Sequence, residues 1–179
     1  SSDLDTWNNM LEQPSGKPYL ICYFLHKKLF REEFAIAQKI AKSRSLELKV
    51  INARFGPNSF RKGTVFDAGP REFVNLIANA SYVCTDSFHG TIFSIMYNKT
   101  FFTFKRFSDS QKSSMNSRVK NILSIVGLSN RLFENSITPD AALAYQVDWS
   151  DVNKRLNDFR KSSREYFERA VKCLKGAQE

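Results

Sequence analysis

The sequence has few of the residues that build metal sites and disulfide frameworks. Its 179 residues include 3 cysteines and 2 histidines, without a C-x-x-C pair or a Cys and His spacing typical of zinc. Neither a bound metal nor a set of disulfides is therefore expected. Cys22 and Cys84 lie in apolar runs and Cys173 in a helical run, which indicates reduced, buried thiols in a cytosolic protein.

Long apolar runs are also absent. The longest, residues 19–25, is far shorter than the roughly 20 residues that a membrane-spanning helix needs. The chain opens at Ser1 with no basic segment or cleavage site, so no signal peptide is recognised and we expect a part of a longer protein. The prediction is a cytoplasmic protein, and peripheral contact with the inner face of a membrane stays open.

What the sequence does contain is an apolar core and positive charge. Hydrophobic residues make up 42% of the chain and aromatic residues 13%, with 16 phenylalanines, which is enough for one domain with a sizeable core. The formal net charge is +9. An anionic partner is favoured, whether a phosphorylated small molecule, nucleic acid or an anionic membrane face.

Apolar runs of strand length alternate with stretches of helical periodicity. Strands are predicted at 18–25, 46–51, 64–66, 82–85 and 100–104, and helices at 31–43, 70–79, 91–97, 118–126 and 150–175. This alternation predicts an α/β fold with a Rossmann-like parallel sheet and helices on both faces. The expected organisation is a linker or terminal arm over 1–17, the Rossmann-like domain over 18–147 and a long amphipathic C-terminal helix over 148–179.

Parallel sheets of this kind bind ligands at the carboxyl ends of their strands, so the loops after Leu25, Thr85 and Phe104 are the expected site. After the strand that ends at Thr85, Asp86 and Ser87 are good N-cap residues, and the following residues form the first turn of a helix. Free backbone N–H groups and the helix dipole at such a start bind phosphate or carboxylate.

Within this corner we predict an acid and a set of binding groups. His89 is the candidate catalytic acid, because a histidine exchanges protons near neutral pH. Gly90 would let a ligand approach the backbone. The residues predicted to bind the donor or its phosphate are Asp86, Ser87, Phe88, Gly90, Thr91, Lys105, Arg106 and Arg118.

The basic members of that set belong to a positively charged stretch. Between residues 99 and 120 the chain has six basic residues against one acid: Lys99, Lys105, Arg106, Lys112, Arg118 and Lys120, against Asp109. The serine-rich stretch 108–117 is predicted to be a flexible loop that closes over an anion. His26, Lys27 and Lys28 add charge to the same edge. The alternative is that Asp86 and Ser87 only cap a helix and the cations only form a solvated face.

Several segments resemble the carboxyl-terminal half of polysaccharide pyruvyl transferase family proteins, over roughly residues 18–135 and with greatest specificity between Gly69 and Tyr97. They are Gly69–Phe73, Leu76–Ala80, Tyr82-Val83, Thr85–Thr91, Ser94-Ile95, Ser117-Arg118 and Gly127-Leu128. The resemblance implies one half of a GT-B-like architecture, with the acceptor-side N-terminal half missing.

The resemblance also implies a reaction. Members of the family transfer a unit derived from phosphoenolpyruvate to two hydroxyls of a sugar and form a pyruvate ketal without a cofactor or metal. The histidine that matches His89 would protonate the methylene carbon as general acid. The acceptor would be a saccharide of a bacterial surface polysaccharide or exopolysaccharide, or a lipid-linked precursor.

One departure affects the donor. Pyruvyl-transferring members often have Arg-Leu-His-Ala where this chain has Ser87-Phe88-His89-Gly90, so the arginine that would bind the donor's charge is absent. Lys105, Arg106 or Arg118 could supply that charge from another loop. A GT-B glycosyltransferase with a nucleotide-sugar donor is the first alternative.

The second alternative is a basic polyanion-binding module without catalysis. It is supported by charge alone, because the sequence has no RNA-binding aromatic motif, zinc finger or recognition helix, and a nucleic-acid partner is not expected. The long terminal helix has two possible positions: across to the other half of a two-domain transferase, or packed on its own domain.

Overall fold

The structure is a computed structural model that describes residues 7–9, 11–13, 16–25, 30–51, 63–65, 68–105, 116–133 and 146–176, the side chains of 30, 31 and 174–176 excepted. Six strands form one parallel sheet in the order β3-β2-β1-β4-β5-β6. The strands are β1 Tyr19–Tyr23, β2 Glu47–Ile51, β3 Thr64–Val65, β4 Tyr82–Thr85, β5 Thr100–Phe104 and β6 Leu132–Phe133.

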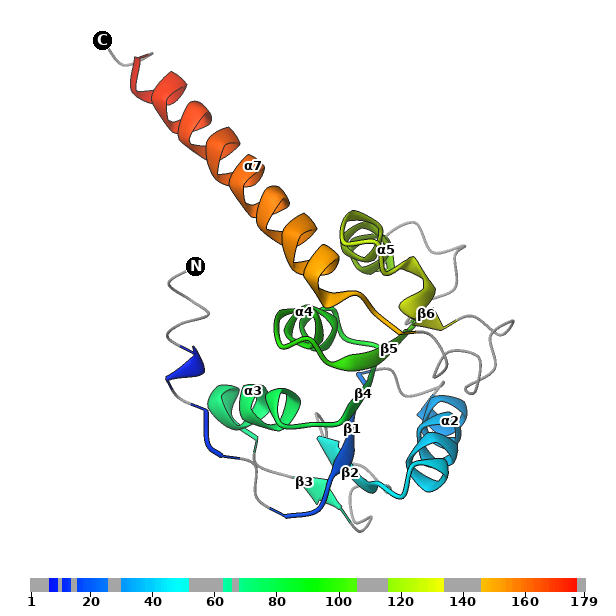
Figure 1. Cartoon of the computed structure of the whole chain (residues 1–179). Coiled ribbons are helices and arrows are strands. Elements are labelled where there is room, and N and C mark those ends of the chain that lie inside the picture. The colour runs from blue at the N-terminus through cyan, green and yellow to red at the C-terminus, as the bar shows by residue number, and fades with distance from the viewer. Residues whose placement is uncertain are drawn as a thin grey trace.

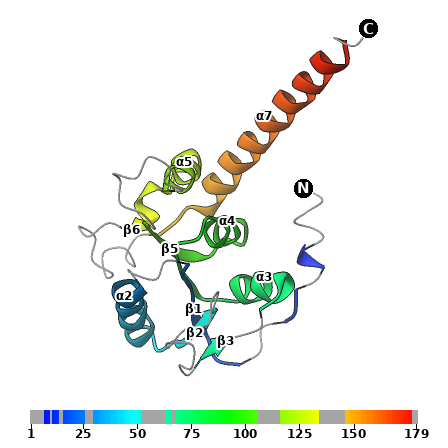
Figure 2. The same ribbon diagram turned by 180° about the vertical axis from the view of Figure 1, so that it is seen from behind.

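The helices cover both faces of this sheet (Figure 1). They are α2 Phe30–Ser43, α3 Pro70–Ala78, α4 Phe88–Met96, α5 Asn116–Ile125 and α7 Trp149–Gly176, with a 3-10 turn, η1, over Ser129–Arg131. Viewed from behind, α2 again lies across the sheet from α3 and α4 (Figure 2). The predicted α/β class with a parallel sheet covered on both faces and a long C-terminal helix is confirmed.

Strand β1 shows why a central strand of this sheet appears in the sequence as a continuous apolar run. Successive side chains point to opposite faces. Tyr19 and Ile21 pack under α3, α4, α5 and the first turns of α7, whereas Leu20 and Cys22 pack under α2. Because both faces are covered, neither set can be polar, and the period-2 alternation disappears from the sequence.

Helix boundaries follow local signals. Pro70 occupies the first helical turn of α3, as predicted. Helix α5 ends in a Schellman motif: Gly127 has φ 74°, its N–H donates to Ser124 O at 3.1 Å, and Leu128 N–H donates to Leu123 O at 2.7 Å. The end of this helix at Gly127 was predicted for that reason.

Some predicted boundaries were wrong. Helix α4 begins at Phe88, in agreement with the predicted cap at Ser87 but earlier than the predicted range 91–97. Helix α5 begins at Asn116, so the last two residues of the serine-rich stretch are helical. Strand β6 was not predicted. Cys22 and Cys84 are buried as expected, but Cys173 is exposed on α7.

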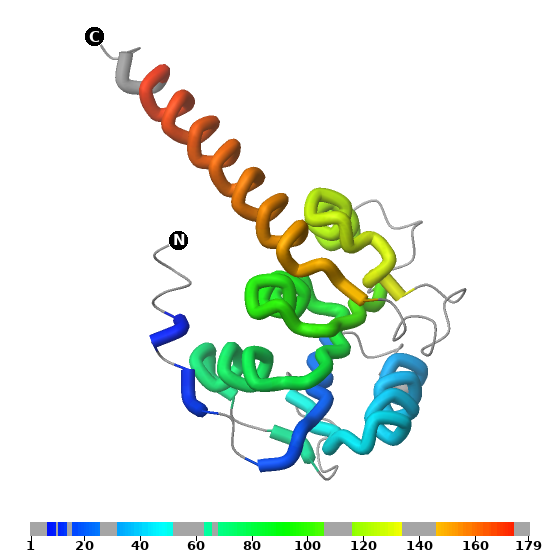
Figure 3. The backbone as a smooth tube through the Cα atoms, in the orientation of Figure 1, coloured from blue at the N-terminus to red at the C-terminus, as the bar shows by residue number. Residues whose placement is uncertain are grey.

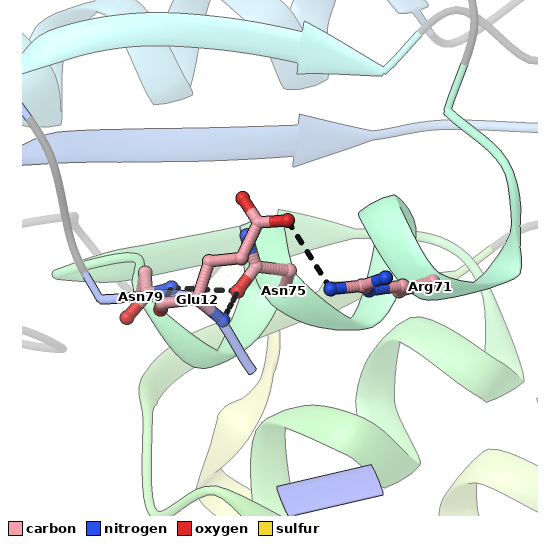
Figure 4. Close-up of polar contacts among 4 residues, drawn as sticks. All are labelled: Glu12, Arg71, Asn75 and Asn79. Atoms are coloured by element: carbon pink, nitrogen blue, oxygen red, sulfur yellow. Dashed lines mark hydrogen bonds and ion pairs between the residues drawn. The ribbon is translucent and has the colours of Figure 1, made fainter. Parts of the chain in front are cut away.

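The N-terminal arm lies along α3. Figure 4 shows Glu12 against this helix: its N–H donates to Asn75 Oδ1 at 2.9 Å, and its carbonyl accepts from Asn79 Nδ2 at 3.0 Å. Its carboxylate lies 3.4 Å from Arg71 Nη2. Further up the arm, the ring of Trp7 packs edge-to-face on Phe93 of α4. The arm therefore contacts α3 and α4.

Helix α7 packs on the domain only at its beginning. Val152 and Leu156 are buried in the same core as α5, whereas Phe159, Tyr166 and Phe167 are 41%, 71% and 68% exposed. In the tube view the rest of the helix runs away from the sheet (Figure 3). The apolar side chains of this predicted amphipathic helix are therefore divided into a packed group and a group exposed to solvent. No helix in the described ranges has the length and apolar character of a membrane span.

Candidate functional site

The candidate site lies at the topological switch point of the sheet, between β1 and β4. From β1 the chain continues to β2 and β3 on one side, and then returns to β4, β5 and β6 on the other. Crevices at the carboxyl ends of the two strands flanking such a point are the usual ligand sites of open parallel sheets. Tyr23 of β1, Thr85 of β4 and Thr103 of β5 are in register there, so the three predicted loops do start side by side.

Thr85 organises the end of β4. Its Oγ1 donates to the carbonyl of Tyr23 at 2.7 Å and accepts from the N–H of Ser87 at 3.0 Å. Asp86 adds a second link, because its Oδ1 accepts from the N–H of Leu25 at 2.7 Å. Two side chains thus tie the ends of β1 and β4 together and direct the chain into α4.

Ser87 is the N-cap of α4, as the sequence predicted. Its Oγ accepts from the N–H of Gly90 at 3.5 Å, and its carbonyl accepts from Oγ1 of Thr91 at 3.0 Å. Thr91 Oγ1 also lies 2.8 Å from Thr103 Oγ1 of β5. Ser87, Thr91 and Asp86 are all buried, so their side chains serve the corner itself.

Gly90 is explained by packing. A Cβ placed there would lie 2.5 Å from Oγ1 of Thr85, too close for any side chain. The helix start therefore sits directly on the residue that joins β1 to β4. This contact accounts for the glycine through α4 packing, whereas the predicted close approach of a ligand stays a prediction.

His89, Phe88 and Arg118 form the accessible part of the corner. His89 is exposed in the first turn of α4, and Phe88 is half-buried beside it, with ring centroids 6.0 Å apart. The guanidinium carbon of Arg118, an exposed residue of α5, lies 4.3 Å from the centroid of the Phe88 ring. This cation–π contact holds a positive charge on the face of Phe88, the ring that neighbours His89.

The structure says less about the other basic residues that were predicted for the site. Lys105 is half-buried and follows β5 directly, at the expected edge. Lys99 precedes β5 and so lies at the opposite end of the strand. Arg106, Lys112 and the segment 26–28 lie outside the described residues, as does most of the serine-rich stretch.

A cavity of about 490 Å³ is lined in part by His89. It lies between α3 and α4, at the ends of β1 and β2, and the arm supplies one wall. Within the described part of the chain it is lined by Trp7, Tyr23, Ile51, Ala68, Gly69, Pro70, Phe73, Val74, His89 and Phe93. Apart from His89, this set contains no ionisable side chain other than the phenol of Tyr23.

A buried carboxyl group lies on the α2 side of the same edge. Glu33, in the first turn of α2, is 3% exposed, and within the described part of the chain neither of its oxygens has a hydrogen-bond partner. Burial raises its pKa to about 8, and the negative charges of Asp86 and then Glu32 add to the shift. At neutral pH Glu33 is therefore a neutral acid.

Of the cavity residues, sequence reasoning singled out His89 as a candidate site residue, and it did not find Glu33. Tyr23 falls in the predicted strand 18–25, Phe73 and Phe93 fall in predicted helices, and Trp7 falls in the predicted linker or terminal arm. Glu33 has the sequence signature of an ordinary exposed acid at a helix start.

No group of three or more His, Cys, Asp and Glu side chains that could hold a metal occurs among the residues placed by the structure. The described site thus has one imidazole, one arginine stacked on an aromatic ring, a capped helix start and an aromatic cavity. Fold and site together define a Rossmann-like α/β domain whose ligand edge lies at the switch between β1 and β4.

The comparison with protein families identifies the family. The model for polysaccharide pyruvyl transferase matches residues 15–106, which is just over half of the 179 residues and includes the whole corner from Thr85 to Thr91. The chain belongs to the polysaccharide pyruvyl transferase family. Arg118 and the helices α5 and α7 lie outside the matched region.

Two further comparisons add little. No curated protein matches the sequence. Among solved structures, the chain is similar to one assigned as a UDP-N-acetylglucosamine 2-epimerase from Listeria monocytogenes, with 12% identity and a TM-score of 0.49. That match covers 85% of this chain and 44% of the other, so the chain spans less than half of that structure's length.

Proposed function

We propose that this chain is the donor-binding domain of an enzyme that transfers a pyruvyl group from phosphoenolpyruvate to a saccharide of a surface polysaccharide or its precursor. Membership of the polysaccharide pyruvyl transferase family supports the reaction class. The observation that carries the proposal is the placement of His89, exposed in the first turn of α4, beside the Arg118–Phe88 pair. The candidate acid and the cation thus both lie beside the Phe88 ring at the start of α4.

In the proposed reaction His89 is the general acid. It gives a proton to the methylene carbon of phosphoenolpyruvate while one sugar hydroxyl adds to the neighbouring carbon. The carbon–oxygen bond to phosphate then breaks, phosphate leaves with the electron pair, and a second sugar hydroxyl adds to the same carbon. One hydroxyl proton replaces the proton that His89 gave, the other leaves with phosphate, and the product is the pyruvate ketal.

Arg118 supplies the charge that the corner itself lacks. Where pyruvyl-transferring relatives often have an arginine, Ser87 caps α4 with its hydroxyl and is buried. Arg118 reaches the same corner from α5 and is held on the face of Phe88. A guanidinium in that position pairs with a carboxylate or phosphate through charge-assisted hydrogen bonds.

Calorimetric titration of the chain with phosphoenolpyruvate tests this proposal. Arg118→Gln should weaken binding about tenfold or more, because a charge-assisted pair contributes roughly 1.5–3 kcal/mol. His89→Gln should also weaken it, through the loss of a donor beside the anion. Arg164→Gln, on the exposed distal part of α7, is the matched control. Unchanged affinity in both corner variants would place the donor elsewhere.

A nucleotide-sugar donor is the second candidate. The observation that favours it is the aromatic cavity beside His89. Its aromatic walls fit the ring of a base better than they fit phosphoenolpyruvate. In that case the diphosphate, and not phosphoenolpyruvate, would lie at the start of α4.

A further inference from the structure

The first turn of α2, residues 30–33, lies beside the two strands that flank the switch point. Helix α2 covers one face of the sheet, and this turn follows the carboxyl end of β1 (Figure 1). On that face, Cys22 of β1 and Cys84 of β4 are in register and fully buried. Burial raises the pKa of both thiols, and the charge of Glu33 raises it further, so Glu33 lies close to them.

Glu33 is enclosed without the contacts that stabilise a carboxylate. It is 3% exposed, and among the described residues neither of its oxygens has a hydrogen-bond partner. In the same part of the chain, the ionisable groups that face it are Cys22 from β1, Cys84 from β4, Asp86 from the loop after β4 and Glu32 from α2. These groups are acids or thiols, and a buried charge without an opposite partner is costly. Glu33 is therefore stable in this position only as a neutral acid.

The same turn borders the link between the two strands. Asp86 is buried, and its Oδ1 accepts from the N–H of Leu25 at 2.7 Å. Burial is the main cause of the raised pKa of Glu33, and the charge of Asp86 is the next. A second negative charge at Glu33 would repel this carboxylate in an interior that contains little water. Movement of the turn into solvent relieves both the repulsion and the cost of burial.

We propose that residues 30–33 form a pH-dependent lid on the ligand edge, which is closed while Glu33 is neutral and opens when Glu33 loses its proton. The closed lid keeps the pKa of Glu33 at about 8, whereas an exposed glutamate has the ordinary value of 4.5. The ratio of open to closed lid should therefore rise about tenfold per pH unit between these values and level off above about pH 8. Such local opening needs no unfolding of the whole domain.

Alkylation of the two buried thiols reports the opening. Cys173, the exposed thiol, is first replaced by serine, so that Cys22 and Cys84 are the only thiols of the chain. Iodoacetamide then labels them while the lid is open, and mass spectrometry measures the rate between about pH 6 and pH 8. A free thiol reacts about tenfold faster per pH unit in this range, so opening of the lid should steepen the rise to about a hundredfold per unit.

Two variants at Glu33 remove the ionisable group. Glu33→Gln keeps the shape of the neutral acid, and Glu33→Met places an apolar side chain of similar length, so a folding defect in one of them does not decide the result. In the Cys173→Ser background both should show only the tenfold rise of a free thiol. Glu165→Gln, at an exposed position on α7, is the matched control and should keep the hundredfold rise.

Urea separates the lid from unfolding of the whole domain. At about 1 M urea, labelling through the lid should change little, whereas labelling through global unfolding should accelerate about fivefold or more. Equal slopes with and without Glu33, no labelling up to pH 8, or acceleration by urea would each overturn the proposal. The assay contains no donor, so its failure leaves the proposed function to the separate titration with phosphoenolpyruvate.

Discussion

Glu33 is a residue whose environment reverses the usual pH behaviour of a carboxylate. Its pKa rises from 4.5 to about 8, so the folded chain keeps a proton that the unfolded chain loses above about pH 4.5. Folding therefore binds a proton between these two values, and the free energy of unfolding falls as pH rises through this window. Asp86, Glu32, Cys22 and Cys84 are the ionisable groups coupled to it.

Glu33→Gln, which mimics the neutral acid, should remove this pH dependence. Wild-type stability should fall between pH 5 and pH 8 by at most about 1.4 kcal/mol per pH unit, whereas the variant should lose less. Urea unfolding across this range measures both slopes. Glu165→Gln, at an exposed position on the distal part of α7, is the control and should keep the wild-type slope. Parallel curves for wild type and Glu33→Gln would show that Glu33 is ionised in the folded state.

Gly90 is the second residue with a specific structural demand. Gly90→Ala would bring a methyl group to 2.5 Å from Oγ1 of Thr85, the atom that bonds to Tyr23 and Ser87. We expect a loss of about 1–3 kcal/mol of stability. Equilibrium unfolding measures it, and the Gly90→Ala, Thr85→Ala double variant should lose less than the sum of the two single losses. A variant as stable as wild type would mean that α4 can shift freely.

At the scale of elements, α7 combines two different parts. Its first turns bury Val152 and Leu156 in the core of α3, α4 and α5, whereas Phe159 and the residues after it face solvent increasingly. Most of the helix therefore does not depend on the domain for burial, and the domain depends only on the first turns.

Removal of residues 161–179 should leave the domain folded, with stability within about 0.5 kcal/mol of wild type. Leu156→Ala should cost about 2–4 kcal/mol, because it leaves a cavity between α7 and α5. Tyr166→Ala, at a position 71% exposed, is the control and should have little effect. Thermal and urea unfolding give all three values. A truncated chain that fails to fold would show that the distal part stabilises the domain.

At the scale of the whole molecule, strands were predictable to the extent that they are buried on both faces. Strands β4 and β5 have the predicted bounds, 82–85 and 100–104, because continuous apolar runs are easily recognised. Strands β3 and β6 have two residues each at the two edges of the sheet, and of these only β3 was predicted. The order of strands follows from none of these runs.

The site was predictable where it is local. The cap at Ser87, the exposed histidine two residues later and the glycine at Gly90 belong to one short segment, so sequence reasoning could place them together. The buried state of Asp86 and Thr91 could not be read in this way, because it depends on hydrogen bonds to β1 and β5. The contact between Arg118 and Phe88, which lie thirty residues apart in the chain, could not be predicted from the sequence either.

The sequence by itself determined the class of fold, the family and the position of the corner after β4, because burial pattern, capping residues and the Gly69–Tyr97 motif are properties of neighbouring residues. Only the tertiary structure decided that Trp7, Tyr23, Phe73 and Phe93 enclose a cavity beside His89, and that Glu33 is a neutral acid. Those properties arise from strand order and helix packing, which bring distant residues together and exclude water from between them.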